Sequence, residues 1–327
     1  MSNLHSIMRL LRREEHPPRN DILLLEALPM RVVWLGWEEI YTTRRVKEAA
    51  KAQGLELEAC SVHDVSFNVE GGKANAFAFG RNLLESYDGL VVRTFYPYIS
   101  ESLTLARLFH DAGKVVIDES LTDEGYAVSK MHDHLVLAEH GIPTPRTWQV
   151  FNPRRVEELA EQLTYPCLLK GVHGARGEHV YIVQNGEQLQ RRLWHYPYGE
   201  LMLQEYLPAV EDYRVMVVGY RALPLMVSRK PPKGDFRTNY SLGARFTRRN
   251  LSEFPAFQSL AENAARALRR EFTAVDIRLK GGQPLALEVN RQPDFEGFER
   301  ATKFDVAAEA VRYICRRVEK NQRAAKR

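Results

Sequence analysis

Cysteine is scarce in this sequence, with three residues in 327, at Cys60, Cys167 and Cys315. Because these thiols are odd in number and far apart, we expect them to stay reduced, which excludes a disulfide framework or a cysteine-based metal cluster. No apolar run approaches the about 18 residues that a membrane-spanning helix needs. The N-terminus also lacks the compact apolar segment and small-residue site of a secretory signal. The sequence therefore predicts a soluble cytoplasmic protein without a membrane partner.

Common catalytic signatures are missing as well. The chain has no Cys-x-x-Cys pair, no nucleophile elbow around a serine and no Gly-x-Gly-x-x-Gly fingerprint. His132 and His134 lie two residues apart in a predicted helix, so their side chains face apart and a histidine metal pair is not expected. The sequence thus offers neither a covalent nucleophile nor a dinucleotide fingerprint.

The basic excess is small and lies at one end of the chain. The formal net charge is +4, but residues 316–327 alone hold six Lys or Arg and one Glu, which leaves 40 basic against 41 acidic residues elsewhere. We expect residues 321–327 to form a solvated basic tail, with a nucleic-acid or ribosome contact as the less favoured alternative.

Residues 1–29 are predicted to form a helical extension. Apolar side chains at positions 4, 7, 8 and 11 have helical spacing, and the prolines at 17 and 18 end the pattern. This apolar face has to cover something, and we favour the protein's own fold or a second copy of the chain over a membrane or a foreign partner.

Residues 30–120 have the pattern of an α/β domain. Strand-like segments alternate with helical lengths, which predicts βαβ units and a parallel sheet. The expected strands are 31–36, 55–62, 89–95 and 114–118, and the expected helices are 41–53 and 101–111.

The pattern then changes to α+β. A helix over 130–140 is followed by Gly141-Ile-Pro-Thr-Pro145, which we interpret as an exposed hinge. Short turns between the later strands favour antiparallel pairing, most clearly at Gly281-Gly282. The expected strands are 166–172, 179–183, 201–207, 213–219, 221–230, 274–280 and 284–290, with helices over 253–271 and 305–320.

The most informative stretch is Leu287-Glu-Val-Asn290, with Asp276 on the preceding hairpin strand. Alternate residues of a strand share a face, so Glu288 and Asn290 point the same way, and Asp276 can join them across the turn. Two carboxylates and an amide oxygen suit Mg²⁺, which prefers oxygen ligands. The apolar residues Val275, Ile277, Leu287 and Val289 should occupy the core face. The alternative is an ordinary exposed polar strand face.

A second stretch is Lys170-Gly-Val-His-Gly-Ala-Arg-Gly177. Backbone N–H groups of a loop containing Gly174 and Gly177 can cradle phosphates, while Lys170 neutralises charge. It is not a P-loop, because the Gly-Lys-Ser/Thr ending is absent and no helix follows. A flexible hairpin is the alternative.

Two further stretches carry polar side chains in a suggestive order. In Gln204-Glu-Tyr-Leu207, the strand end at residues 205–207 could offer backbone groups to an adenine edge, and Asp212 could accept from ribose hydroxyls. Taken alone, these residues are better explained as a strand end and a turn aspartate. Residues 229–249 hold seven basic residues and one acid, Asp235. Arginine forks suit phosphates and carboxylates, and a solvated basic loop is the alternative.

These four stretches occur together and in this order in the ATP-grasp superfamily. The chain most resembles the RimK-like ligases that add glutamate to a ribosomal protein, over residues 31–318. The motifs that carry the resemblance are Gln204-Glu-Tyr, Gly234-Asp-Phe-Arg-Thr-Asn239, Val275-Asp-Ile and Glu288-Val-Asn290. After Asn290, Arg291-Gln-Pro-Asp294 replaces the family's usual small residue and Pro-Gly.

The resemblance implies an α/β N-terminal domain followed by an α+β ATP-grasp fold, whose two antiparallel sheets clasp ATP. Residues 30–120 would precede the ATP-grasp part, 121–196 would form its central and lid subdomain, and 197–320 its C-terminal subdomain. Lys130, Lys170, Gly174 and Gly177 would contact phosphates, Glu205, Tyr206 and Leu207 adenine, and Asp212 ribose. Asp276, Glu288 and Asn290 would hold Mg²⁺ or Mn²⁺, and Arg229, Arg237 and Asn239 would face the transferred phosphoryl group and acyl substrate.

The implied reaction is ATP-dependent joining of a carboxylate and an amine through an acyl phosphate. We expect an acidic amino acid, glutamate before aspartate, because the cations of residues 229–249 exceed what ATP needs and would be costly to bury without a ligand. The other substrate is a carboxylate or amine acceptor, such as a protein or peptide terminus. Alternatives are a small-molecule peptide or amino-group-carrier ligase, and a non-catalytic ribosome or protein binder.

Overall fold

The computed structural model describes residues 29–172, 180–193, 200–208 and 210–327. The predicted N-terminal helix and the two loop glycines, Gly174 and Gly177, lie outside these residues. No helix within the described part is long and apolar enough to cross a membrane.

The first sheet is parallel, as the sequence predicts, with the strand order β2-β1-β6-β7. Alternate strand residues pack on opposite faces: Val32 and Trp34 lie in one apolar cluster, Val33 and Leu35 in another. Helices α1 and α9 cover the first face and α3 the second. The strands are Arg31–Leu35, Glu56–Cys60, Gly89–Val92 and Val115–Ile117 (β1, β2, β6, β7), and the helices Tyr41–Ala52, Ile99–Asp111 and Val306–Ala325 (α1, α3, α9).

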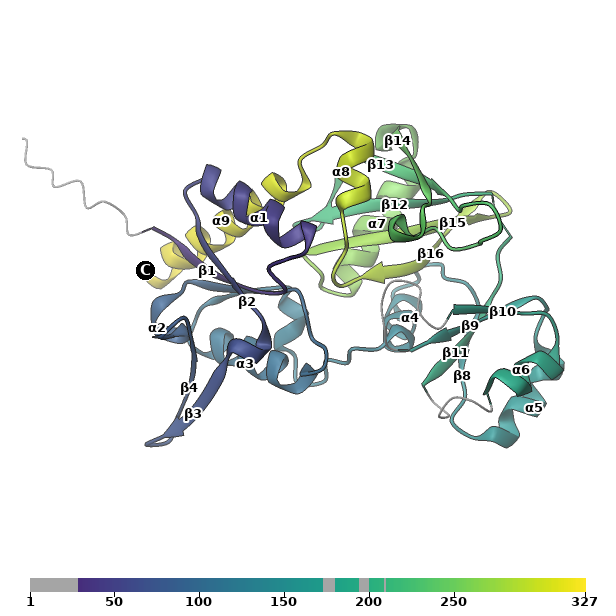
Figure 1. Ribbon diagram of the computed structural model, residues 1–327, viewed down its shortest axis with the longest axis horizontal. Coiled ribbons are helices and arrows are strands. Elements are labelled where there is room, and N and C mark those ends of the chain that lie inside the picture. The colour runs from purple at the N-terminus through teal and green to yellow at the C-terminus, as the bar shows by residue number, and fades with distance from the viewer. Residues whose placement is uncertain (1–28, 173–179, 194–199, 209) are drawn as a thin grey trace, which may run out of the picture.

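A small antiparallel sheet that the sequence analysis did not predict projects from this domain (Figure 1). Its strands β3 (Ser66–Glu70) and β4 (Lys73–Ala78) are joined by Gly71-Gly72, both with positive φ. β3 is exposed throughout and only Ala76 and Ala78 of β4 are buried, so the strands give little apolar alternation to reveal them. Strand β5 (Arg81–Asn82), α2 (Leu83–Ser86) and the 3₁₀ turn Val62–Asp64 complete this region.

The second sheet is antiparallel and has the order β10-β9-β11-β8. Leu159 of α5, Leu163 just after that helix and Leu189 of α6 pack in its core. Helix α4 (Lys130–Glu139) precedes it. The strands are Thr147–Gln149, Cys167–Gly171, Val180–Val183 and Leu201–Glu205 (β8 to β11), and the helices are Pro153–Gln162 and Gly186–Leu193 (α5, α6).

The third sheet, of order β14-β13-β12-β15-β16, is also antiparallel. Helix α7 packs on one face, and α8 with the start of α9 on the other. That second face shares a core with the first sheet, so the two sheets form one packed body (Figure 1). The strands are Asp212–Val218, Arg221–Lys230, Arg245–Asn250, Phe272–Lys280 and Gln283–Asn290 (β12 to β16), and the helices Pro255–Ala267 and Glu296–Thr302 (α7, α8).

Two local expectations are wrong. Helix α9 does not end at Lys320 but continues to Ala325, and Asn321 donates to Gly113 O at 2.7 Å. The segment predicted as a frayed tail is therefore helical almost to its end, and its basic residues suit a helix C-terminus. The hinge after α4 is not fully exposed: Ile142 is buried, and Ala286 N of β16 donates to Pro143 O at 2.9 Å.

Candidate active site

The three predicted oxygen ligands lie together on one face of the hairpin of β15 and β16. Asp276 and Glu288 are direct cross-strand partners, and Asn290 lies two residues further on the same strand. Val275, Ile277 and Val289 point to the opposite face and pack in the cluster under α7. The hairpin turn therefore produces the cluster that the sequence pattern predicts.

Leu287 departs from the predicted alternation. The register shifts because Asp276 pairs with Glu288 whereas the next residue, Ile277, pairs with Ala286. Leu287 is thus the extra residue of a β-bulge, and it is half-buried beside Glu288 instead of entering the core. Bulges often re-aim side chains at sites of this kind.

The two lysines come from separate elements and reach the same small cavity. Lys130, at the start of α4, lies with its Nζ 3.2 Å from Glu288 Oε1. Lys170, on β9, donates to Gln204 Oε1 at 2.6 Å. The cavity is lined by Lys130, Asp133, His134, Leu137, Lys170, Met202, Leu287, Glu288 and Val289. It therefore lies where α4, the second sheet and the third sheet meet.

Gln204 organises the second-sheet side of this cavity, although the sequence analysis assigned it no role. It is fully buried, and its amide nitrogen donates to His134 Nε2 and to Thr147 Oγ1, both at 3.1 Å. Burial, and secondarily Lys170, lower the pKa of His134 to about 4, so the imidazole is neutral and can accept this bond. Burial lowers the pKa of Lys170 to about 8, against the opposing effect of Glu288.

A network of arginines and aspartates lies beneath the oxygen cluster. Arg214 donates to both carboxylate oxygens of Asp276, at 2.8 and 2.9 Å, and Arg229 reaches Asp276 Oδ2 at 3.1 Å. Burial alone would raise the pKa of Asp276, but these two guanidinium groups hold it far below its usual range. Burial alone would also raise the pKa of Glu288, but Lys130 holds this pKa below its ordinary value. Both carboxylates are therefore ionised.

Asp212 anchors the same network. Its Oδ1 accepts from Arg229 Nε at 2.7 Å and its Oδ2 from Thr238 Oγ1 at 2.6 Å. Asp212 and Arg229 are each only 3% exposed. This burial argues against a ribose contact for Asp212 and against direct substrate contact for Arg229 in this conformation, so both assignments stay predictions.

The loop between β13 and β14 carries the other two predicted catalytic residues. Arg237 pairs with Asp235 at 2.7 Å, and Asn239 heads the short 3₁₀ turn Tyr240–Leu242. Neither contacts Asp276, Glu288 or Asn290 in the described structure. Thr238, between them, ties the loop to Asp212.

The predicted adenine edge lies where β11 ends. Glu205 is held by Lys280 at 2.5 Å, and Leu207 O accepts from Arg278 Nη1 at 2.7 Å. Arg278 also lies 3.5 Å from Asp212 Oδ2. These bonds fasten Glu205 to Leu207, including the half-buried Tyr206, beside the third sheet.

Asp133 and Arg291 join the site to α4. Asp133 Oδ1 accepts from Arg270 and from Arg291, both at 2.6 Å, and Arg291 also donates to Tyr126 OH at 2.8 Å. Arg291 thus pins the end of β16 to α4. The partners are 137 and 158 residues apart, so no local signal could have revealed them.

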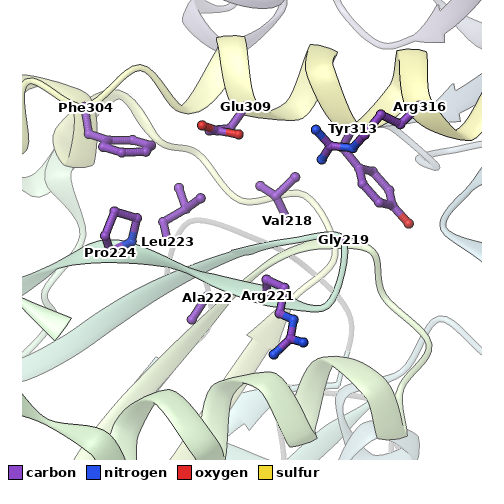
Figure 2. A pocket seen from close by; sticks show the side chains of 10 residues that line it. All are labelled: Val218, Gly219, Arg221, Ala222, Leu223, Pro224, Phe304, Glu309, Tyr313 and Arg316. Atoms are coloured by element: carbon purple, nitrogen blue, oxygen red, sulfur yellow. The ribbon is translucent and has the colours of Figure 1, made fainter. Parts of the chain in front are cut away.

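A larger cavity in the described structure lies elsewhere. It measures about 530 Å³ between the β12–β13 turn and α9, and Gly219, Leu223, Phe304 and Tyr313 are among its lining (Figure 2). It contains none of the predicted site residues, and it lacks the clustered lysines and carboxylates of the smaller cavity. We therefore assign the chemistry to the smaller one.

Comparison with known proteins identifies the family of the segment that carries this site. The model of the RimK-like ATP-grasp domain matches residues 127–314, which include α4, both lysines and the β15–β16 hairpin. The chain belongs to the RimK-like ATP-grasp family. It is accordingly an enzyme of the ligase class that forms C–N bonds with ATP.

Relatives cover nearly the whole chain. A probable alpha-L-glutamate ligase of Shewanella loihica is 26% identical over 87% of this chain and 94% of its own length. A ribosomal protein bS6–L-glutamate ligase of Shigella boydii is 26% identical over 84% and 92%. Among solved structures, the ATP-grasp ligase PsnB with its minimal precursor has a TM-score of 0.68 at 18% identity, covering 89% of this chain and all of that one. A RimK domain protein of Sphaerobacter thermophilus has a TM-score of 0.64 at 17% identity, covering 87% and 99%. These two likenesses establish the ATP-grasp fold.

Proposed function

We propose that this RimK-like ligase joins a carboxylate to the amine of an acidic amino acid, with glutamate as the first candidate. The observation that carries the proposal is the convergence of Lys130 and Lys170 on a cavity bordered by Glu288, next to Asp276 and Asn290. Two lysines from separate elements can bind the phosphates of a nucleotide, and the oxygen ligands beside them can bind its metal ion.

The oxygen set fits Mg²⁺ or Mn²⁺. Asp276 and Glu288 are ionised, and Asn290 donates its amide nitrogen to Ala274 O at 3.1 Å, so that its amide oxygen is available to an ion. Asp276 already accepts from two arginines, but each carboxylate oxygen has a second lone pair. A bound ion would neutralise charge on the phosphates of ATP.

The residues of the chain act chiefly by positioning and by charge. Lys130 and Lys170 would hold the phosphates, and Glu205 to Leu207 would line the adenine. Arg229 lies behind Asp276 and adds positive charge there. Arg237 and Asn239 would face the reacting groups from the β13–β14 loop.

The proposed reaction has two steps. A substrate carboxylate oxygen attacks the γ-phosphorus of ATP, and ADP leaves, which gives an acyl phosphate. The amine nitrogen then attacks the acyl carbon, and phosphate leaves as the amide forms. Both steps need alignment and charge neutralisation instead of a protein nucleophile, consistent with the absence of nucleophile motifs from the sequence.

Support for glutamate comes from the relatives, which are named as glutamate ligases, and not from the basic loop. Burial of unpaired cations, the argument from sequence, does not apply: five of the seven residues are exposed and make no ion pair with the described residues. These five are Lys230, Lys233, Arg245, Arg248 and Arg249. The choice of acceptor also rests on similar proteins: one relative is named for a ribosomal protein, and one solved ATP-grasp ligase is complexed with its precursor. We therefore propose a protein or peptide terminus as the acceptor.

ADP release tests the proposal when each of the twenty amino acids is supplied alone and in pairs with candidate acceptors. We expect ADP and phosphate with glutamate or aspartate. Glu288→Gln should abolish release, and Glu187→Gln, an exposed helix residue, should not. Stoichiometric AMP would overturn the acyl-phosphate route, and turnover with apolar or basic amino acids alone would overturn the acidic substrate.

A further inference from the structure

Four aromatic residues follow the strands at the carboxyl edge of the first sheet. Trp37 follows β1, His63 follows β2, and Tyr96 and Tyr98 follow β6. The ring centroids of Trp37 and His63 are 5.8 Å apart, and those of His63 and Tyr98 are 4.9 Å apart. Trp37 is 48% exposed, Tyr96 49% and Tyr98 37%. We call these four residues the aromatic platform. Solvent-exposed aromatic clusters of this kind mark interaction surfaces.

The platform lies where sheets of this type bind ligands. In the order β2-β1-β6-β7, the chain leaves β1 toward one side and later returns to β6 on the other side. The carboxyl ends of β1 and β6 therefore flank the switch point of the sheet, where a crevice opens. Trp37 and Tyr96 stand on the two sides of this point.

The platform is continuous with the ligation site. Arg93, in the same loop as Tyr96, donates to Phe272 O at 3.4 Å and lies 4.7 Å from the centre of the Phe272 ring. Phe272 begins β15, the strand of Asp276. The first and third sheets lie side by side in Figure 1.

The border of the platform is acidic. Glu38 and Glu39 adjoin Trp37, and Asp64 adjoins His63. Glu38 is neutralised by Lys47 at 2.8 Å, but Asp64 accepts only from the backbone of Ser61, and Glu39 makes no ion pair with any described residue. Two carboxylates therefore remain without a cation beside the rings. An occupant with basic as well as apolar side chains complements them.

We propose that the aromatic platform binds a polypeptide substrate of the ligase through apolar and basic side chains near the residue that is ligated. This inference rests on the proposed function, because the platform would supply a substrate to that site. A polypeptide is favoured over a free amino acid by size: the platform extends across β2, β1 and β6, two interstrand spacings or roughly 10 Å. Buried aromatic residues commonly dominate such binding.

The test uses the full-length chain and three fluorescein-labelled decapeptides, of alternating Leu and Lys, Leu and Glu, or Ser and Lys. Fluorescence anisotropy should show the Leu/Lys peptide binding at least about tenfold more tightly than the other two. The double variant Trp37→Ala, Tyr98→Ala should lose at least about tenfold in affinity. Phe151→Ala, which removes a ring that is 71% exposed away from the platform, is the matched control and should bind normally.

Glu39→Lys provides a second variant at an exposed position, where folding is not at risk. It should weaken Leu/Lys binding and strengthen Leu/Glu binding. Wild-type affinity in the double variant, or equal binding of the Leu/Lys and Leu/Glu peptides, would overturn the proposal. If the double variant lost dimer mass in sedimentation while its peptide affinity stayed unchanged, the proposal would also be overturned. The platform would then be assigned to contact with a second copy of the chain.

Activity separates this proposal from the one on which it rests. Platform variants should release ADP with small substrates at the wild-type kcat, since none of these rings belongs to the proposed ligation machinery. If the wild-type chain releases no ADP with any substrate pair, the proposed function fails, and peptide binding still decides whether the platform is a docking surface.

Discussion

Asp276→Asn should abolish ligation and also destabilise the fold, whereas Glu288→Gln should abolish ligation alone. Asp276 is enclosed by two guanidinium groups, with the contacts of Arg214 at 2.8 and 2.9 Å and of Arg229 at 3.1 Å. The side chains of Asp276 and Arg214 are only 11% and 12% exposed, and that of Arg229 is 4% exposed. Glu288 has one ion-pair partner, Lys130, and its side chain is 36% exposed.

The magnitudes follow from what each change leaves behind. Removing one partner of a buried ion pair costs about 3–5 kcal/mol, because a buried charge is left uncompensated. Asparagine can still accept one hydrogen bond from Arg214, so we expect about 3 kcal/mol for Asp276→Asn, the lower end of that range. For Glu288→Gln we expect less than about 1 kcal/mol, as for other solvated pairs. Loss of a metal ligand should lower turnover at least about 100-fold in both variants.

Thermal unfolding without added metal, followed by circular dichroism, measures the difference. A loss of about 3 kcal/mol corresponds to a midpoint about 6–12 °C lower for Asp276→Asn, with little change for Glu288→Gln. Arg248→Gln, an exposed position without an ion pair among the described residues, controls for charge change alone. Equal midpoints for the Asp276 and Glu288 variants would refute the argument that Asp276 is structural as well as catalytic.

Four further predictions concern pH, the C-terminus and packing. ATP affinity should fall between pH 7 and 9, because burial lowers the pKa of Lys170 to about 8 and only the protonated amine attracts phosphate. Equal ATP affinities at pH 7 and pH 9, measured by calorimetry, would contradict this. Burial raises the pKa of Glu271 from 4.5 to about 7, so its contribution to stability is full below pH 4.5 and is lost as pH rises through 7. Glu271→Gln should therefore flatten the thermal midpoint between pH 5 and 8, and a wild-type slope would be evidence against it. Deleting residues 322–327 removes the bond from Gln322 to Asp88 at 3.1 Å and should lower the midpoint by less than about 2 °C without changing turnover on small substrates; an inactive product would show that the site needs this segment. Gly219→Ala should cost about 1–3 kcal/mol in urea unfolding, because the added Cβ would lie 2.4 Å from the Tyr313 ring; Gly234→Ala, also at positive φ but with nothing within 4 Å, should cost clearly less.

The local parts of the site could be predicted from the sequence because their partners are close along the chain. Asp276 and Glu288 face each other across a turn marked by two glycines, Gly281 and Gly282, which both adopt positive φ. Strand alternation then placed Asn290 on the same face. The bulge at Leu287 was missed, because an extra residue in a strand leaves no trace in an apolar–polar pattern.

The distant parts of the site depend on tertiary structure. Gln204 lies between Lys170 and His134, which are 34 and 70 residues away from it, and neither contact has a sequence signal. The sequence suggested a role only for the backbone of residues 205 to 207, and Gln204 entered only as part of a family motif. The continuation of α9 on the first domain was likewise hidden, because Gln322 and its partner Asp88 are 234 residues apart.

By itself, the sequence determined the kinds of strands and helices, the hairpin that carries the oxygen ligands, and the family that the chain resembles. These depend on side-chain periodicity, turn residues and short motifs, all of which act over a few neighbouring residues. Only the tertiary structure showed that Asp212 and Arg229 form a buried ion pair, with Nε and Oδ1 2.7 Å apart. Whether a charged side chain binds a ligand or another residue depends on which strand packs beside it, and that is settled by the fold of the whole chain.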